Sequence, residues 1–344
     1  MTSDESWIAR AKHRGPRTLA DGSAFMLAVN VAAFAAFAIA LPDFRSPANL
    51  ATVLVSSLPL LLLATGQTFV LVSAGIDLSS PALVGLVSVC GGLVMSADVG
   101  WLANHPAAVP VGLLAMLATG TAAGAANGFC VARLQMPPFM VTLTTAMFAG
   151  GLAVWLVHAV AQTETLFNLP EVFLALGRHG WVDGPLAVGA AFVAHVILAR
   201  SLVGRWLHAL GYNARAAYLS GVPTSRVIVC AYALSGLFAA LAAVLLTARL
   251  ETASPSHGRP LLLDVIGAAV IGGTSLAGGR GSVLWTAWGV LFLAMLGNGL
   301  TLLNLSDFVI TIIKGLVILT AALLDQWRRH WRTTSASVAD TVIA

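Results

Sequence analysis

Long apolar segments alternate with short polar ones along most of this chain, and ten such segments can be placed. Several are close to the roughly 20 apolar residues that a helix needs to cross the hydrocarbon of a bilayer. The segments lie roughly at 24–41, 50–73, 80–97, 107–132, 139–160, 185–200, 227–249, 261–277, 282–303 and 308–325. The pattern therefore predicts an all-α integral membrane protein, a polytopic bundle of about ten transmembrane helices.

Broken helices are expected in two places, and the clearer one lies between Val265 and Leu300. There two apolar segments flank a glycine- and serine-rich hinge with hardly a charge in it. Non-helical backbone at membrane depth persists only where protein buries it or where it lines a cavity. This stretch therefore favours a broken helix beside a pathway. The glycine-containing region 66–85 shows a faint similarity to region 267–283.

Composition agrees with a chain that crosses the membrane several times. Hydrophobic residues make up 58% of it and charged residues 9%, whereas globular domains carry about 25% charged residues. We expect one transmembrane domain over 24–325, with a basic cytoplasmic tail at 1–23 and a second cytoplasmic tail at 326–344. The three cysteines lie in apolar segments and have no metal-binding spacing, so no metal site is predicted.

The distribution of basic residues predicts the orientation, because cytoplasmic loops are enriched in Lys and Arg. Both ends of the chain are basic, so both termini should be cytoplasmic and the number of spans even. Alternation then places 201–226, the richest internal basic cluster, in the cytoplasm as well. Segments 161–184 and 250–260 fall outside, where Arg249 and Arg259 mildly contradict the rule.

Several function classes lack support in the sequence. Neither lysine, Lys12 or Lys314, follows a phosphate-binding P-loop pattern, so nucleotide hydrolysis by that chemistry is excluded for this chain. Ionisable residues are scarce within the apolar segments, which disfavours transport coupled to protons or ions. The formal net charge of +4 comes largely from the ends and loops, so we expect contact with membrane lipid and none with nucleic acid.

The cytoplasmic stretch 210–222 has the features of a short helix between two spans. Asn213 suits its N-cap and Gly221 its termination. The small residues Ala216 and Ala217 at its middle would let it dock into a groove on another protein. An ordinary interhelical connector remains the alternative.

Five stretches in chain order form a more specific pattern. They are Gly66–Val70 with Ser73–Ser79, Asn127–Gly128 with Pro137–Leu143, Leu210–Val222, Ser235–Leu237 with Thr247–Leu250, and Ile271–Ser282 with Asn298–Leu300 and Lys314–Gly315. Together they resemble the permeases of ATP-binding-cassette importers, in the ribose/sugar-type branch. Stretch 210–222 resembles the coupling helix of that family, and the likeness covers about 50–325.

Three departures from the family pattern limit what the resemblance implies. Leu262-Leu263-Asp264 stands where an acidic residue usually opens the triplet, Thr144 replaces a common glycine, and Arg215 occupies a position that is often acidic. These differences weaken any transfer of substrate specificity or ATPase pairing, but not of the fold.

The resemblance implies a permease subunit in a bacterial inner membrane, working with three kinds of partner. These are a second permease subunit, identical or different, a cytoplasmic ATPase pair that holds ATP and Mg, and an extracytoplasmic solute-binding protein. It implies no cofactor on this chain and a sugar as cargo, with a nucleoside or a signalling furanose as the alternatives. The expected ATPase-coupling residues are Gly211, Asn213, Ala216, Ala217 and Gly221.

The candidate residues for the pathway and its helix breaks are polar or glycine positions near apolar segments. They are Gln67, Gly75, Asp77, Ser79, Asn127, Gly272, Gly273, Thr274 and Asn298. Asp77 would cap the following helix, contact a passing solute, or contact the ATPase or loop partners. Asn127 and Asn298 would bond across helices beside their glycines or line the pathway.

Two other classes of function are weighed against the importer subunit. A secondary transporter or channel would work without an ATPase, and it is the alternative prediction for a small neutral solute. A membrane-embedded enzyme would need catalytic His, Asp or Ser residues clustered at one depth, and the sequence contains no such cluster.

Overall fold

The computed structural model describes residues 19–178 and 180–323, and these segments are helical without a strand. The α-helices are α2 Leu19–Ala40, α3 Pro47–Val72, α4 Ser80–Met95, α5 Ala108–Arg133, α6 Pro138–Ala161, α7 Glu171–Arg178, α8 Gly180–Arg200, α9 Leu202–Tyr212, α10 Ala214–Leu219, α11 Thr224–Leu250, α12 Leu262–Ile271 and α13 Val283–Leu302. There are also two 3-10 turns: η1 Pro42–Arg45 lies between α2 and α3, and η2 Arg259–Leu261 directly precedes α12. Residues 307–323 are also helical.

Each of the ten predicted apolar segments lies on a helix, which confirms the all-α polytopic class. Within the described residues, six helices are long and apolar enough to cross a membrane: α3, α5, α6, α11, α13 and, from Val182, α8. The eighth segment, predicted at 261–277, differs most from expectation. Its helix α12 has 10 residues, about 15 Å of rise, which is half of the roughly 30 Å of hydrocarbon. Gly273, with φ of 103°, follows it in a conformation that ends a helix.

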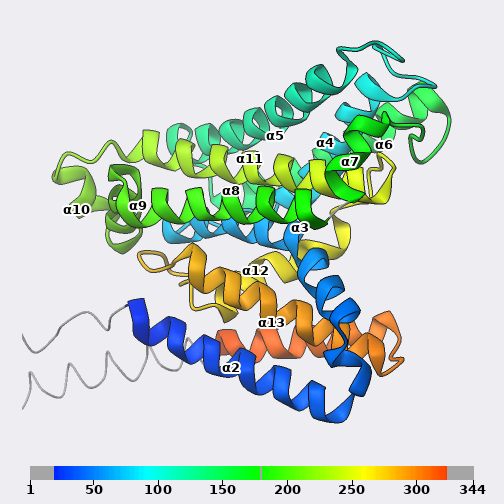
Figure 1. The fold of residues 1–344 in the computed structure, drawn as a ribbon. Helices are drawn as coiled ribbons and strands as arrows, with labels where there is room; N and C mark the ends of the chain where they lie inside the picture. Colours follow the sequence, from blue (N-terminus) through cyan, green and yellow to red (C-terminus); the bar gives the residue numbers. More distant parts are fainter. Residues whose placement is uncertain (1–18, 179, 324–344) are drawn as a thin grey trace, which may run out of the picture.

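The helices run roughly along one direction of an elongated bundle (Figure 1). In this view α5 and α11 lie along the top, α8 and α3 below them, and α12, α13 and α2 at the bottom. The short helices α9 and α10 gather at the left end, where the first turn of α2 and the last described turn near residue 323 also lie. Helix α7 lies at the opposite end.

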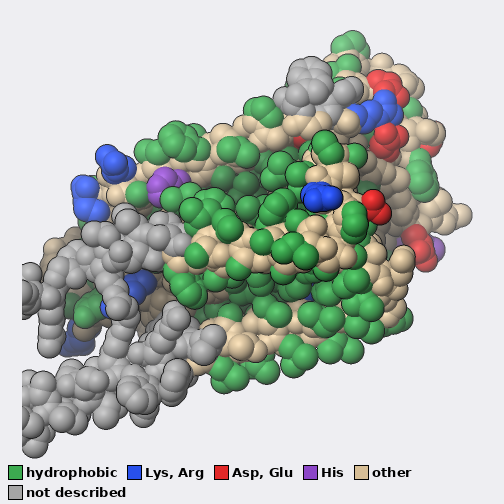
Figure 2. All heavy atoms as spheres, turned by 60° about the horizontal axis from the view of Figure 1, so that its bottom comes forward, with side chains coloured by type: hydrophobic (Ala, Val, Ile, Leu, Met, Phe, Trp, Pro, Cys, Tyr) green, Lys and Arg blue, Asp and Glu red, His purple; other side chains and the backbone are tan. Residues whose placement is uncertain are grey.

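Charged side chains are concentrated at the two ends of the bundle (Figure 2). Most of the Lys and Arg side chains in this view lie at the left end, and others lie toward the right, where the Asp and Glu side chains are found. The face between them is dominated by hydrophobic side chains. This distribution is what a membrane imposes, because a charge within the hydrocarbon is costly.

The central contact of the bundle is the close crossing of α5 with α11. Gly120, Gly124 and Gly128 repeat every fourth residue along one side of α5. A Cβ atom on Gly124 would lie 2.2 Å from the carbonyl oxygen of Tyr232, and one on Gly236 would lie 2.0 Å from that of Gly120. Small residues at this spacing let helix backbones approach within a membrane, where dispersion drives association.

Residues 251–258, predicted as part of an outer loop at 250–260, instead run back along α4. Three close approaches fix this course: Ala253 against Gly92, Pro255 against Gly85, and Gly258 against Pro81. From residue 253 to residue 258, the contacted residues of α4 lie progressively nearer to the first turn of that helix. The segment is therefore packed into the bundle, and its predicted place on the outer side stays a prediction. Glycines remove the Cβ atoms that would otherwise keep this segment off α4.

Candidate functional site

The break between α3 and α4 is organised around the buried carboxylate of Asp77. Its Oδ1 accepts hydrogen bonds from the backbone N–H of Ser79 at 2.8 Å and from the Ser79 hydroxyl at 2.6 Å. Its Oδ2 accepts one from the Ser235 hydroxyl of α11 at 2.7 Å. Because Ser79 precedes the first helical residue of α4, the carboxylate orders the break itself rather than the first turn of the helix.

The network continues into α5 and α6 with a consistent direction of donation. The Thr145 hydroxyl donates to Asn127 Oδ1 at 2.6 Å, and Asn127 Nδ2 donates to the Ser79 hydroxyl oxygen at 2.9 Å. The Ser79 hydroxyl in turn donates to Asp77. Each donor therefore points toward the carboxylate. Hydrogen bonds aligned in this way reinforce one another in a low dielectric, and the network ties the break to three helices.

Tyr232 of α11 holds the backbone on the other side of the break. Its hydroxyl donates to the carbonyl oxygen of Ile76 at 3.2 Å, and its side chain is fully buried. A Cβ atom on Gly75 would lie 2.6 Å from this hydroxyl oxygen. Gly75 is therefore needed for the close approach of Tyr232.

The second break, between α12 and α13, connects to α3 through hydroxyl groups. The hydroxyls of Thr274 and Thr286 lie 3.4 Å apart, and Thr286 is 2.8 Å from the hydroxyl of Thr68 on α3. A Cβ atom on Gly272 would lie 2.3 Å from the carbonyl oxygen of Trp285. Gly272 thus allows α12 to pack directly against the start of α13.

The two breaks meet at the end of α9. The backbone N–H of Gly279 donates to the carbonyl oxygen of Val72 at 2.9 Å, at the C-terminus of α3. A Cβ atom on Gly211 would lie 1.9 Å from that oxygen and 2.4 Å from the nitrogen of Gly279. In addition, Nδ1 of His208 lies 3.2 Å from the carbonyl oxygen of Gly279. A displacement of α9 would therefore act on both breaks directly.

Helix α10 projects from the same end with the local structure predicted for it. The side chain of Asn213 caps it by accepting the N–H of Ala216 at 2.9 Å. Gly221 follows its end with φ of 84°, a left-handed conformation that suits glycine. Ala217 is buried, whereas Tyr218 and Leu219 are exposed. Segment 201–226 therefore holds two short helices, α9 and α10, where the sequence predicted one.

Two candidate residues, Gln67 and Asn298, lie outside the groups of contacts at both breaks. Asn298 pairs with Asn49 of α3 through reciprocal amide hydrogen bonds of 2.9 Å, which matches one of the two roles expected for it. Gln67 is fully buried, and neither amide atom has a hydrogen-bond partner within the described part of the chain. Such a group is costly to bury, so Gln67 stays a candidate for contact with a solute.

Three further residues complete the network, and none of them was a predicted site residue: Tyr232, Ser235 and Thr145. Each is a polar residue within an otherwise apolar span. Polar residues in such spans are candidates for functional contacts, and this signal would have identified them. Among residues 19–178 and 180–323, no group of three or more His, Cys, Asp or Glu side chains is placed to hold a metal ion.

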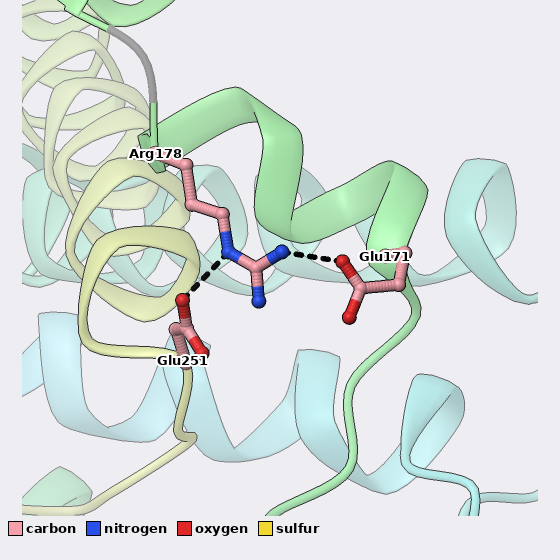
Figure 3. Close-up of polar contacts among 3 residues, drawn as sticks. All are labelled: Glu171, Arg178 and Glu251. Carbon is pink, nitrogen blue, oxygen red and sulfur yellow. Dashed lines mark hydrogen bonds and ion pairs between the residues drawn. The ribbon is translucent and has the colours of Figure 1, made fainter.

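At the opposite end, Arg178 fastens α7 to the end of α11 (Figure 3). Its guanidinium group pairs with Glu171 and, at 2.6 Å, with Glu251. Hydrogen bonding from Arg178 lowers the pKa of Glu251.

Arg249, one of the two arginines that contradicted the predicted orientation, donates to the carbonyl oxygen of Val55 at 2.7 Å. That bond gives a structural reason for an arginine at position 249 on the predicted outer side, but it gives none for Arg259.

The chain is similar to permease components of known transport systems. Residues 49–322 match the family model described as branched-chain amino acid transport system / permease component. The ribose import permease protein RbsC of Bacillus subtilis (strain 168) is 37% identical over 292 residues, 83% of this chain and 87% of that protein. The L-arabinose transport system permease protein AraH of Escherichia coli (strain K12) is 31% identical over 321 residues, covering 90% and 92%. No solved structure matches the chain.

Proposed function

The chain belongs to the family of branched-chain amino acid transport system permease components, and on this premise we propose how it takes part in solute import. It is a multi-pass protein of the bacterial inner membrane and a permease subunit of an ATP-binding-cassette importer, not an enzyme. ATP hydrolysis resides on a separate chain. In our proposal the two broken helices form the movable part of a translocation pathway.

The observation that carries this proposal is the contact of α9 with both breaks. A cytoplasmic ATPase that binds the end formed by α9 and α10 would push on Gly211, which touches Val72 and Gly279. The breaks on either side would then tilt α4 and α13 relative to α3. Such a step is coupling between two distant sites through an element with two arrangements. Gly211, Asn213, Ala216, Ala217 and Gly221 are the proposed coupling residues.

We place both termini and α9–α10 in the cytoplasm, with ten membrane crossings in all. The first turn of α2, the last described turn near residue 323 and α10 lie at one end of the bundle. Basic side chains gather there, as the positive-inside rule requires. In this topology α12 crosses together with the returning segment 251–261, because α12 by itself spans only about half of the hydrocarbon.

The proposed cargo is a neutral sugar. The names of two similar proteins specify ribose and L-arabinose. The polar groups near the breaks are mostly hydroxyls and amides, with Asp77 engaged by three hydrogen bonds. Such groups exchange hydrogen bonds with a polyol and leave no unpaired charge. Gln67, Asn127 and Thr274 are the proposed polar groups closest to the path.

The complete transporter would contain a second permease subunit, identical or different, besides the ATPase pair and an extracytoplasmic solute-binding protein. ATP and Mg would bind the ATPase, and no cofactor is assigned to this chain. The solute-binding protein would select the cargo, so the pathway needs only weak contacts with it. Membrane lipid would cover the remaining apolar surface.

The test is reconstitution of the permease with its partner ATPase in lipid vesicles. We expect ATP hydrolysis to rise, and labelled sugar to accumulate, when the binding protein is added with one member of a panel of neutral sugars that includes ribose and arabinose. The panel would identify the cargo in the same experiment. Movement of sugar down its gradient by the permease without an ATPase would instead support a secondary transporter or channel.

If α10 couples the ATPase to the pathway, substitutions in or just after α10 should impair transport without preventing the protein from folding. Replacing Ala217 with Trp should reduce ATP-driven uptake by more than about tenfold, because its buried position has no room for an indole. Gly221→Val should have a similar effect through its positive φ, which disfavours a β-branched residue. Uptake is measured beside the amount of permease in the membrane.

The control is Tyr218→Phe, which changes an exposed side chain on the same short helix by one hydroxyl group. It should leave uptake and membrane abundance at wild-type values. If Ala217→Trp and Gly221→Val transport normally, the coupling assignment is wrong.

A further inference from the structure

A hollow of about 530 Å³ lies beside α6, on the side turned away from the helix's buried residues. Its lining consists of Gly150, Gly151, Val154, Trp155, His158 and Ala159 of α6, together with Arg259 of η2. Its volume is within the range of about 300–1,000 Å³ found for small-molecule sites. The residues of α6 follow the helical repeat, so they form one continuous strip.

The glycine pair keeps this strip open. A Cβ atom on Gly150 or Gly151 would meet nothing within 4 Å. This differs from Gly85 and Gly258, where the chain uses the missing Cβ for close packing. Two adjacent glycines weaken a helix interior, and packing within the chain gives no reason for them. They leave room for an occupant against the backbone of α6.

Arg259 enters the hollow from the returning segment rather than from a loop tip. Gly258 packs on Pro81, at the first turn of α4, and the N–H of Arg259 donates to the carbonyl oxygen of Ser256 at 3.1 Å. The base of the side chain is therefore fixed deep in the bundle. Within residues 19–178 and 180–323, its guanidinium group has no hydrogen bond or ion pair, and Arg259 is exposed. In the topology proposed above this face lies within the membrane, where an unpaired cation is costly against lipid, so we place it on a hydrated pathway.

The side chains in the hollow suit a neutral, polyhydroxylated ring. Trp155 is 64% exposed and offers an aromatic face, whose negative quadrupole attracts the C–H groups of a sugar. The guanidinium group of Arg259 offers a planar fork of donors, and His158 adds a ring nitrogen that donates or accepts. The lining contains no carboxylate, which disfavours a cationic solute.

We propose that this hollow is a sugar-contact site on the translocation pathway. The sugar ring stacks on Trp155 over the Gly150–Gly151 pair, and Arg259 and His158 bind its hydroxyl groups. The proposal rests on the importer function proposed above and names the residues that receive the solute. Because α6 runs from the end bearing α9 toward the opposite end, the strip lies in the outer half of the proposed topology.

The test uses the complete transporter in vesicles, with ribose-loaded or arabinose-loaded binding protein as the probe, whichever supports uptake. Trp155→Ala should lower the maximal uptake rate about tenfold, while the concentration of loaded binding protein at half-maximal rate stays within about twofold. Trp101→Ala is the matched control, since Trp101 is 79% exposed outside the hollow, and it should transport like the wild type. Thermal unfolding of each variant reports its folding.

Variants of Arg259 distinguish a sugar from an anionic lipid headgroup. Arg259→Gln retains hydrogen-bond donors and should keep more of the uptake rate than Arg259→Lys, because a neutral sugar needs directed donors and not charge. A headgroup phosphate would reverse that order. Arg259→Met should lose about as much uptake as Trp155→Ala.

The possible outcomes are separable. If wild-type vesicles show no ATP-driven uptake with any sugar in the panel, the importer function itself fails. If the wild type transports but Trp155→Ala and Arg259→Met do so at its rate, the contact site alone is refuted. A raised half-saturating concentration at an unchanged maximal rate would also refute it, in favour of a docking surface for the binding protein. Loss of uptake together with a lowered unfolding temperature would assign these residues a structural role instead.

Discussion

Replacing Gly236 with valine is expected to prevent the bundle from assembling. The new Cβ atom would lie 2.0 Å from the carbonyl oxygen of Gly120 and 3.0 Å from the Cα atom of Gly124. Both are backbone atoms of α5, so the clash is relieved only if the two helices separate. Overpacking a core usually costs about 1–3 kcal/mol, and we expect more than about 3 kcal/mol here because no side chain can rotate away. Membrane abundance and the unfolding temperature of solubilised protein would report the loss.

Gly189→Val is the matched control for this substitution. Gly189 lies inside α8, and a Cβ atom there would meet nothing within 4 Å. Valine also has a higher helix propensity than glycine, so the control should be as stable as the wild type or slightly more stable. Normal abundance and an unchanged unfolding temperature for Gly236→Val would show that the α5–α11 crossing is looser than described.

Replacing Asp77 with leucine is expected to destabilise the protein by about 3–5 kcal/mol and to abolish measurable uptake. The substitution leaves the Ser79 N–H, the Ser79 hydroxyl and the Ser235 hydroxyl without their acceptor in a buried site. Each such orphaned group costs about 1–3 kcal/mol. The break between α3 and α4 would lose its order, and force applied at α9 would no longer move α4 as one body. Chemical unfolding and uptake in vesicles would measure the two effects.

The variant Asp77→Asn tests whether the hydrogen-bond geometry or the negative charge of the Asp77 side chain is what matters. The amide oxygen still accepts both bonds from Ser79, and the Ser235 hydroxyl oxygen accepts from the amide nitrogen. We expect a loss of about 1–2 kcal/mol, because bonds to a charged acceptor are stronger, with partial uptake. Equal losses for the leucine and asparagine variants would show that the charge matters more than the geometry. A change in sugar preference at unchanged stability would instead favour direct contact with the solute.

Local features of the sequence determined the membrane class, the location of the apolar helices and the ends of α10. A run of apolar residues is sufficient for a helix in lipid, because each backbone N–H and C=O must be satisfied within the segment. Asn213 and Gly221 act through their own backbone and the next turn. Such interactions depend on a few neighbouring residues and are therefore visible in the sequence.

The partners of the polar groups depended on the tertiary structure. The sequence indicated that Asp77, Asn127 and Asn298 were unusual, but not that Asn127 would meet Ser79 or that Asn298 would meet Asn49. In a membrane, the face of a helix that contacts lipid is as apolar as the face that contacts another helix. The hydrophobic pattern therefore gives the spans but not the orientation of each helix in the bundle.

The course of residues 251–258 and the half-length helix α12 were likewise decided by packing. Their sequence resembles an ordinary loop followed by an apolar span, and the contacts that turn the segment back lie on α4, far away in the chain. The same fold brings Arg259 beside Trp155. The sequence by itself thus determined what the membrane demands of each segment. The tertiary structure decided which segments touch, because close approach depends on glycines and hydrogen-bond partners contributed by two distant segments at once.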